Sequence, residues 1–149
     1  MGRILTTRFG AIEYGDANVI RFCGGLLGFE QYERYVLMDS KGSDLAFRWL
    51  QSVDDPALAF LLCDPTRIIP DYCPPVQRSD LSMLALDELR SAIIMCIVTV
   101  PEDPELATAN FQAPLVINAS GRLGKQVITG LPSYKTRQSV FAARKQKAG

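Results

Sequence analysis

The sequence predicts a mainly β protein, an antiparallel barrel or sandwich with one short helix. Three observations lead to this fold class. Many short segments are alternating or continuously apolar, turn residues separate them at regular spacing, and only one segment has the apolar periodicity of a helix. A chain of 149 residues fits one domain, which is large enough to bury a core without disulfides.

The predicted strands are short, and turn residues bound them. The first two flank Gly10, which predicts a tight bend between them. Two later segments, Ala57–Cys63 and Ala92–Val100, are apolar throughout, as expected of strands that are covered on both sides. The full set is Leu5–Phe9, Ala11–Tyr14, Asn18–Cys23, Tyr35–Met38, Leu45–Ser52, Ala57–Cys63, Ala92–Val100, Leu115–Asn118 and Lys125–Thr129.

Two Asp-Pro pairs flank one of these strands, and their aspartates could be turn residues or paired catalytic acids. An extended chain advances about 3.3 Å per residue, so Asp55 and Asp64 would lie roughly 30 Å apart at opposite ends of the strand. Carboxylates that act on one bond lie within about 5–10 Å of each other. Because aspartate before proline favours a turn, we expect turns at both ends of the strand.

One segment is predicted as a helix. It begins at Ser79 or Asp80, either of which can cap it, and it extends to Arg90 with leucines along one side. The loop before it, from Asp64 onward, is long, irregular and rich in proline. Such loops are often functional in compact domains.

The composition argues against an enzyme. The sequence contains no histidine, which removes the commonest general base and the commonest zinc ligand. The cysteines Cys23, Cys63, Cys73 and Cys96 have no Cys-x-x-Cys spacing, and no signal peptide or membrane-length apolar run is present. We therefore expect a cytoplasmic protein with free thiols and without a metal or cofactor.

The charges are segregated along the chain. Up to Glu105 there are 16 acidic and 9 basic residues, whereas from Leu106 onward there are 7 basic residues and no acidic ones. We expect a single β domain over residues 1–134 and a basic, flexible C-terminal tail over residues 135–149. Such asymmetry indicates a charged partner or a solvated acidic body with a frayed basic end.

Several long motifs resemble the FliW family of bacterial flagellar assembly factors, and they occur in the family's order over nearly the whole chain. The motifs are GLLGFEQYERYVL (Gly25–Leu37), FRWLQSVDDPALAFLLCDP (Phe47–Pro65), PDY (Pro70–Tyr72), CIVTVPEDPELATANFQAPLVIN (Cys96–Asn118) and GKQVI (Gly124–Ile128). The resemblance implies a small antiparallel β-barrel-like domain without catalytic activity. It also implies two exchangeable protein partners, newly made flagellin and the RNA-binding translational regulator CsrA, which FliW antagonises.

The resemblance directs attention to two groups of candidate partner-binding residues. Flagellin's terminal segments are amphipathic helices, and such helices bury their apolar face in a groove. The candidate groove walls are Leu26, Leu27 and Phe29, with Ile69 and the exposed aromatic anchor Tyr72 in the proline-rich loop. CsrA should offer basic surface, and the candidate acids that would attract it are Asp71, Glu102, Asp103 and Glu105.

An RNA-binding β-barrel module is the alternative. It would use the basic C-terminal end together with aromatic residues such as Phe111 and Tyr134. The acidic body and a pI near 6.2 argue against it, since phosphate contacts dominate nucleic-acid affinity. We therefore expect protein partners, with no direct nucleic-acid, membrane or small-molecule partner.

Overall fold

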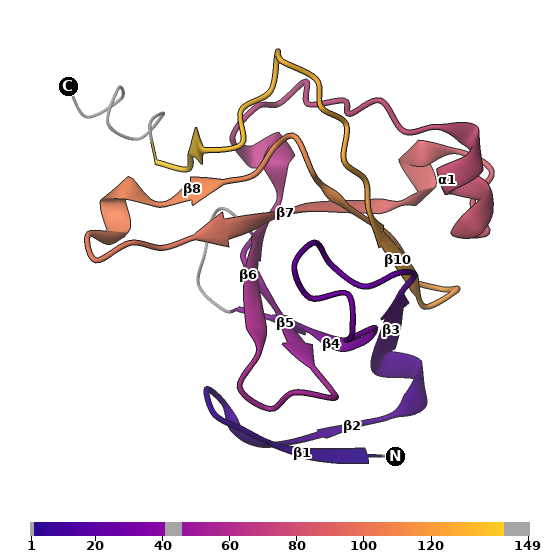
Figure 1. The fold of residues 1–149 in the computed structure, drawn as a ribbon, viewed down its shortest axis with the longest axis vertical. Coiled ribbons are helices and arrows are strands. Elements are labelled where there is room, and N and C mark those ends of the chain that lie inside the picture. Colours follow the sequence, from indigo (N-terminus) through magenta and orange to yellow (C-terminus); the bar gives the residue numbers. More distant parts are fainter. Residues whose placement is uncertain (1, 41–45, 142–149) are drawn as a thin grey trace.

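The computed structural model describes residues 2–40 and 46–141, which form a closed β-barrel with short appended elements (Figure 1). The prediction of a mainly β protein with one short helix is confirmed. The barrel strands, in their order around the ring, are β7 (Ile93–Thr99), β6 (Ala59–Cys63), β5 (Arg48–Ser52), β4 (Arg34–Asp39), β3 (Val19–Phe22), β10 (Leu123–Gln126) and β9 (Leu115–Asn118). Pairing of β9 with β7 closes the ring.

The barrel is not antiparallel throughout, because β10 and β3 run parallel, with Leu123 opposite Arg21. The structure departs from the predicted antiparallel barrel at this one pairing. The reason is geometric: each antiparallel pairing reverses the strand direction, and a ring with an odd number of strands must contain one pair that points the same way. In this ring of seven strands, that pair is β3 and β10.

Four short strands lie outside the barrel. A hairpin of β1 (Gly2–Thr6) and β2 (Gly10–Tyr14) caps one end, where the Phe9 ring contacts the Trp49 ring of β5 edge-on at 5.4 Å. At the other end β8 (Thr108–Ala109) pairs with the last part of β7, and β11 (Gln138–Ser139) pairs with β8. We call this extension of the sheet the β8 wing.

The β8 wing includes residues beyond the domain boundary that was predicted after residue 134. Backbone hydrogen bonds join Phe111 to Lys135 and Val140 to Ala107, and the Val140 side chain is buried. Residues 135–141 therefore belong to the fold instead of forming a flexible tail. The remainder of the predicted tail, residues 142–149, lies outside the described residues.

The helix is shorter than the sequence predicts, since α1 covers only Arg78–Met83. The chain then turns because Leu84 is fully buried and Ala85 takes a positive φ of 56°. A separate single turn of 3-10 helix follows at Leu89–Ser91, and the others are Asp16–Asn18, Pro65–Arg67 and Pro104–Leu106. No helix among the described residues is long and apolar enough to cross a membrane.

The predicted Asp-Pro turns are confirmed. The Asp55 carboxylate accepts a hydrogen bond from the Ala57 N–H, and the Asp64 carboxylate accepts one from the Thr66 N–H, both at 3.0 Å. These bonds bound β6, which begins two residues later than predicted. Both aspartates therefore shape turns at opposite ends of one strand.

The barrel interior is filled by side chains from β3, β4, β5, β6, β7 and β9. The fully enclosed members include Phe22, Tyr35, Leu50 and Leu62. One further member, Leu26, comes from the loop between β3 and β4, which lies across the opening of the ring in Figure 1. This loop closes the barrel and fixes the surface described next.

Candidate functional site

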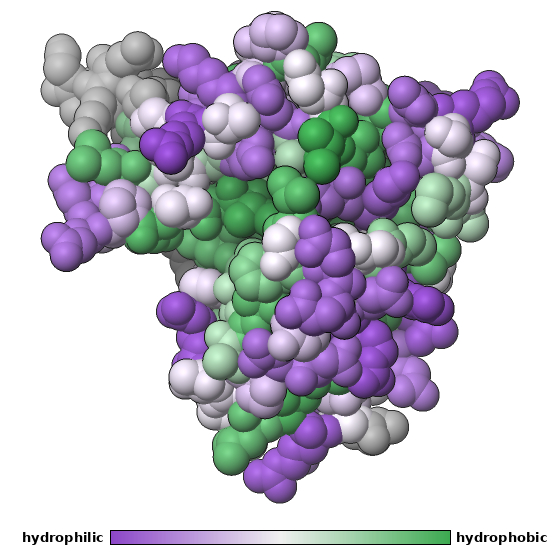
Figure 2. Space-filling view, in the orientation of Figure 1, coloured by the Kyte–Doolittle hydropathy of each residue, from purple (hydrophilic) through white to green (hydrophobic). Residues whose placement is uncertain are grey.

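An open groove separates the β8 wing from the loop between β3 and β4. It encloses about 630 Å³, and Figure 2 shows apolar residues gathered in the hollow beneath the wing. Apolar side chains form much of its lining, and threonine, amide and guanidinium groups form the rest. The lining residues are Leu27, Phe60, Ile97, Thr99, Pro101, Leu106, Thr108, Asn110, Gln126, Thr136 and Arg137.

Adjacent residues of the loop have opposite roles. The Leu26 side chain is only 1% exposed and fills the barrel interior, whereas Leu27 is 61% exposed and faces the groove. Leu26 is therefore not a wall of the groove, and its assignment to the partner surface is corrected. Burial of Leu26 anchors the loop and thereby sets the position of Leu27.

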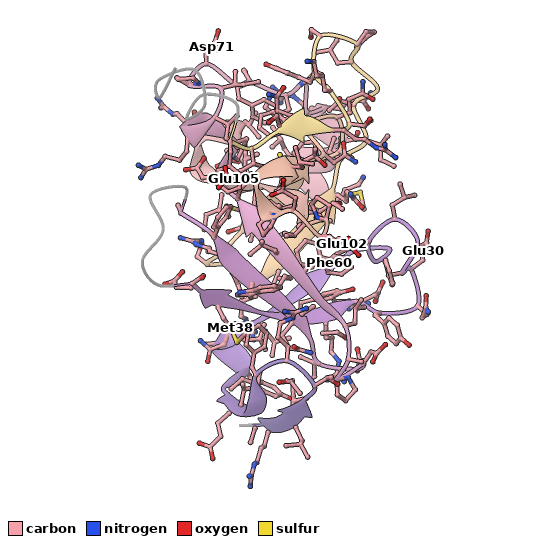
Figure 3. The ribbon with its side chains drawn as sticks, turned by 90° about the vertical axis from the view of Figure 1, so that its left-hand side faces the viewer. Glu30, Met38, Phe60, Asp71, Glu102 and Glu105 are labelled. Carbon is pink, nitrogen blue, oxygen red and sulfur yellow. The ribbon has the colours of Figure 1, made fainter. Side chains whose placement is uncertain are left out.

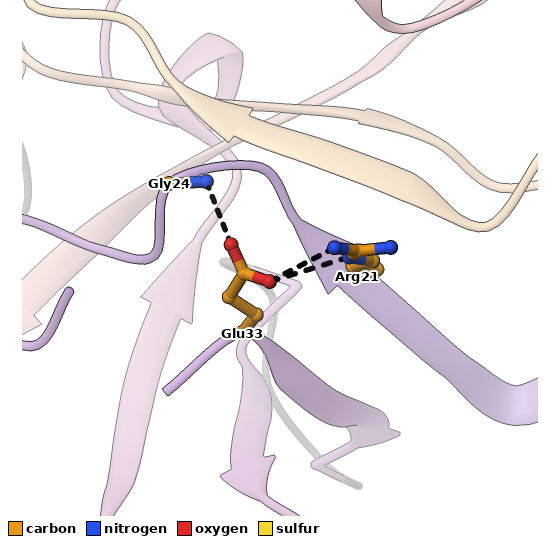
Figure 4. Close-up of polar contacts among 3 residues, drawn as sticks. All are labelled: Arg21, Gly24 and Glu33. Carbon is orange, nitrogen blue, oxygen red and sulfur yellow. Dashed lines mark hydrogen bonds and ion pairs between the residues drawn. The ribbon is translucent and has the colours of Figure 1, made fainter. Parts of the chain in front are cut away.

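Polar contacts hold the same loop in place. The Glu33 carboxylate accepts a hydrogen bond from the Gly24 N–H at 3.1 Å and forms an ion pair with Arg21 at 3.2 Å (Figure 4). On the groove side, the Leu27 N–H donates to the Gln126 side-chain oxygen of β10 at 2.8 Å. The loop backbone is thus fixed from two sides.

The tip of the loop is ordered by a short local contact. Gly28 has a positive φ of 88°, and its N–H donates to the Glu30 carboxylate at 3.0 Å. This backbone hydrogen bond stabilises the ionised carboxylate and lowers the pKa of Glu30. Glu30 therefore adds a negative charge beside the groove (Figure 3).

Phe29 contributes to the groove indirectly. Its ring is half-buried and meets the ring of Phe60 edge-on, with centroids 5.2 Å apart. Phe60 itself lines the groove. Truncating Phe29 would therefore remove support behind Phe60 as well as any direct contact that Phe29 makes.

The predicted acids divide into two places. Glu102, Asp103 and Glu105 are exposed in the turn between β7 and β8, which we call the acidic turn, and its neighbours Pro101 and Leu106 line the groove. The Asp103 carboxylate accepts the Glu105 N–H at 3.1 Å and so also caps the local 3-10 turn. Asp71 is exposed too, but it lies at a distant end of the molecule in Figure 3.

Tyr72 is not the exposed anchor that its loop predicts. It is 7% exposed, and its hydroxyl donates a hydrogen bond to the Phe111 carbonyl at 2.7 Å. Its ring also packs against those of Phe111 and Tyr134, and burial raises the pKa of the Tyr72 hydroxyl. Ile69 is half-buried against the same cluster, so this part of the loop is core.

The described residues contain no metal-binding cluster, and the two thiols that face each other are buried. No group of three or more Cys, Asp or Glu side chains among them could hold a metal ion. Cys63 and Cys96 face each other on neighbouring strands, but burial raises both thiol pKa values, that of Cys63 to about 12. Neither thiol is therefore a nucleophile near neutral pH.

Sequence reasoning missed most of the groove. Phe60 and Ile97 lie in strands that read as continuously apolar. They pair with the enclosed residues Leu50 and Leu62 and so point to the inner face, yet they remain accessible from the groove. Leu106 offered a local signal, because it is a large apolar residue directly after the acidic turn and is 57% exposed. Among the predicted groove walls, Leu27 is the one that lines the groove directly.

The fold and its surface define a small closed β-barrel protein with an accessible apolar groove. A family model described as FliW protein matches residues 3–140. Curated relatives named flagellar assembly factor FliW include those of Leptospira interrogans (33% identical, covering 98% of this chain and 97% of the relative), Caldanaerobacter subterraneus (35%, 91% and 91%) and Natranaerobius thermophilus (37%, 98% and 97%).

A solved crystal structure of the flagellar assembly factor FliW matches the barrel with a TM-score of 0.83 and 36% identity, covering 93% of this chain and 96% of that one. Both the sequence and the fold thus agree over nearly the full length. The chain belongs to the FliW family, a family of non-catalytic proteins.

Proposed function

We propose that this chain acts in flagellar assembly by binding flagellin in the groove and by antagonising CsrA through direct protein contact. The observation that carries the proposal is the pair of exposed leucines, Leu27 and Leu106, on opposite sides of an apolar groove. Large apolar side chains that are exposed around a concave surface mark a protein-binding site. The relatives' shared name supplies the process in which it would act.

The groove is suited to an amphipathic helix. Flagellin's terminal segments have this character, as the family resemblance implies, and they stay unpaired until the filament assembles. A helix that places its apolar face on Leu27, Phe60 and Leu106 would remove these side chains from water and turn its polar face outward. Binding would protect an otherwise aggregation-prone segment of flagellin.

The acidic turn supports contact with CsrA at the same corner of the molecule. Glu102 and Glu105 are exposed and form no ion pair with another described side chain. They lie beside Pro101 and Leu106 of the groove, so a partner attracted to the turn would obstruct the groove. Overlap of this kind would make the two partners mutually exclusive.

The same charges disfavour direct RNA binding. An acidic turn at the rim of the groove repels phosphates, and the predicted aromatic platform is absent because Phe111 is fully buried. A protein-binding regulator therefore fits this surface better than a nucleic-acid module.

Calorimetric titration with monomeric flagellin tests the proposal. We expect Leu106→Asp to weaken flagellin binding at least about tenfold, because a charged group would be buried against the apolar face of the helix. Leu5→Asp is the matched control, since Leu5 is 74% exposed on the β1–β2 hairpin away from the groove. Equal affinities for the two variants would contradict the proposed site.

Association kinetics test whether the acidic turn attracts CsrA or only keeps the protein soluble. We expect the Glu102→Lys, Glu105→Lys double variant to slow CsrA association at low salt and to approach the unmodified rate at high salt. The control is Glu13→Lys with Asp87→Lys, which changes net charge equally at exposed positions outside the acidic turn. An unchanged rate at low salt would refute electrostatic attraction by this turn.

A further inference from the structure

The charged groups around the groove are placed unevenly along its length. At one end the acidic turn presents Glu102, Asp103 and Glu105, all exposed. The wing presents Arg137, which is exposed, lines the groove and forms no ion pair with another described side chain. The groove therefore has acidic residues at the turn and a basic residue on the wing, in addition to its apolar surface.

The pairing of the wing places these charges at opposite ends. The segment before β11 runs antiparallel to β8, since Lys135 is bonded to Phe111, Gln138 is opposite Ala109, and Val140 is bonded to Ala107. The acidic turn lies just beyond Ala107. Lys135 and Arg137 are consequently beside the end of β8 that is farther from the acids.

The spacing matches a short helix. The chain from Leu106 to Asn110, both of which line the groove, takes four steps of about 3.3 Å and so spans about 13 Å. A helix covers that length with about nine residues. Arg137 lies in the turn just before β11 and lines the groove at this end.

We infer that an amphipathic helix lies in the groove in a single direction, with its amino end at the acidic turn and its carboxyl end at Arg137. This inference rests on the proposed binding of a flagellin helix. A helix carries partial positive charge at its amino end and partial negative charge at its carboxyl end, so this direction pairs both ends favourably, whereas the reverse direction opposes both. Arg137 is therefore a residue that determines orientation.

The same polarity defines the preferred partner sequence. The groove selects a helix with an apolar stripe, basic residues near its first turn and acidic residues near its last turn. A helix with the opposite charge order would fit the apolar floor but meet like charges at both ends.

Paramagnetic labelling tests the direction directly. Peptides covering the two terminal segments of flagellin are titrated into the isotope-labelled chain, and the one that binds carries a nitroxide at its first or last turn. We expect the amino-end label to broaden the amide signals of Glu102, Asp103, Glu105 and Leu106, and the carboxyl-end label to broaden those of Thr136 and Arg137. The reversed pattern, or equal broadening at both ends, would overturn the inference while leaving the groove assignment intact.

Charge reversal provides the second measurement. Arg137→Glu should weaken binding of the same peptide by about threefold or more, since an attractive end contact becomes repulsive. Arg3→Glu is the control, because Arg3 is exposed on the β1–β2 hairpin and changes net charge equally. Equal affinity for both variants would refute the role of Arg137. A complete absence of peptide binding to the unmodified chain would instead refute the proposed function itself.

Discussion

The neighbouring residues Leu26 and Leu27 allow folding and partner binding to be separated by two chemically identical truncations. Leu26 is 1% exposed inside the barrel, so Leu26→Ala should lower the free energy of unfolding by about 2–5 kcal/mol. Leu27 is 61% exposed, so Leu27→Ala should change that free energy by less than about 0.5 kcal/mol.

The effect on flagellin binding should be the reverse: among folded molecules, Leu27→Ala should weaken binding and Leu26→Ala should leave it nearly unchanged. Complete burial of a leucine side chain contributes about 1.5–3 kcal/mol, and about three fifths of the Leu27 side chain is available to a partner. Leu27→Ala should therefore cost about 1–2 kcal/mol of binding free energy, which is about a 5- to 30-fold rise in the Kd for flagellin.

Urea denaturation and calorimetric titration measure the two quantities on the same samples. Both truncations remove the same atoms, so each variant serves as the control for the other. Unchanged flagellin affinity in Leu27→Ala would show that the exposed leucine is not part of the contact. Unchanged stability in Leu26→Ala would show that this residue does not anchor the loop.

Two tyrosines provide further predictions. Tyr72→Phe should destabilise the fold by about 1–3 kcal/mol in urea denaturation, since the Phe111 carbonyl loses its buried donor, whereas flagellin affinity should not change. Tyr35→Phe should leave stability at neutral pH unchanged or raise it, because the buried Tyr35 hydroxyl has no hydrogen-bond partner among the described residues. Burial raises the pKa of Tyr35 from 10.0 to about 12, so as the pH rises the unfolded state releases this proton before the folded state does. The free energy of unfolding should therefore fall as the pH rises from 10 to about 12. This fall should be shallower in Tyr35→Phe.

The sequence predicted the elements whose signal is local. The two continuously apolar segments correspond to β6 and β7, and the turns predicted at the two Asp-Pro pairs are present. The parallel pair of β3 and β10 was not predictable in this way, because its direction depends on how many strands complete the ring. The short β8 and β11 strands also lack a signal, since each is only two residues long.

The candidate site was predicted only in part, and its errors have a common cause. Tyr72 lies in a proline-rich loop, which predicts exposure, but its hydroxyl finds the Phe111 carbonyl 39 residues away. Leu26 lies among glycines and is nevertheless drawn into the barrel. Both outcomes depend on contacts between distant segments, whereas the exposure of the acidic turn follows from its own residues.

Hydrogen–deuterium exchange with and without flagellin most directly tests the claim that the groove is the binding surface. We predict slower exchange in the loop between β3 and β4, residues 23–33, and in residues 97–110 of β7, the acidic turn and β8. Exchange in α1 and in the β1–β2 hairpin should not change. Slower exchange confined to α1 or that hairpin, with the loop and the acidic turn unaffected, would contradict the account.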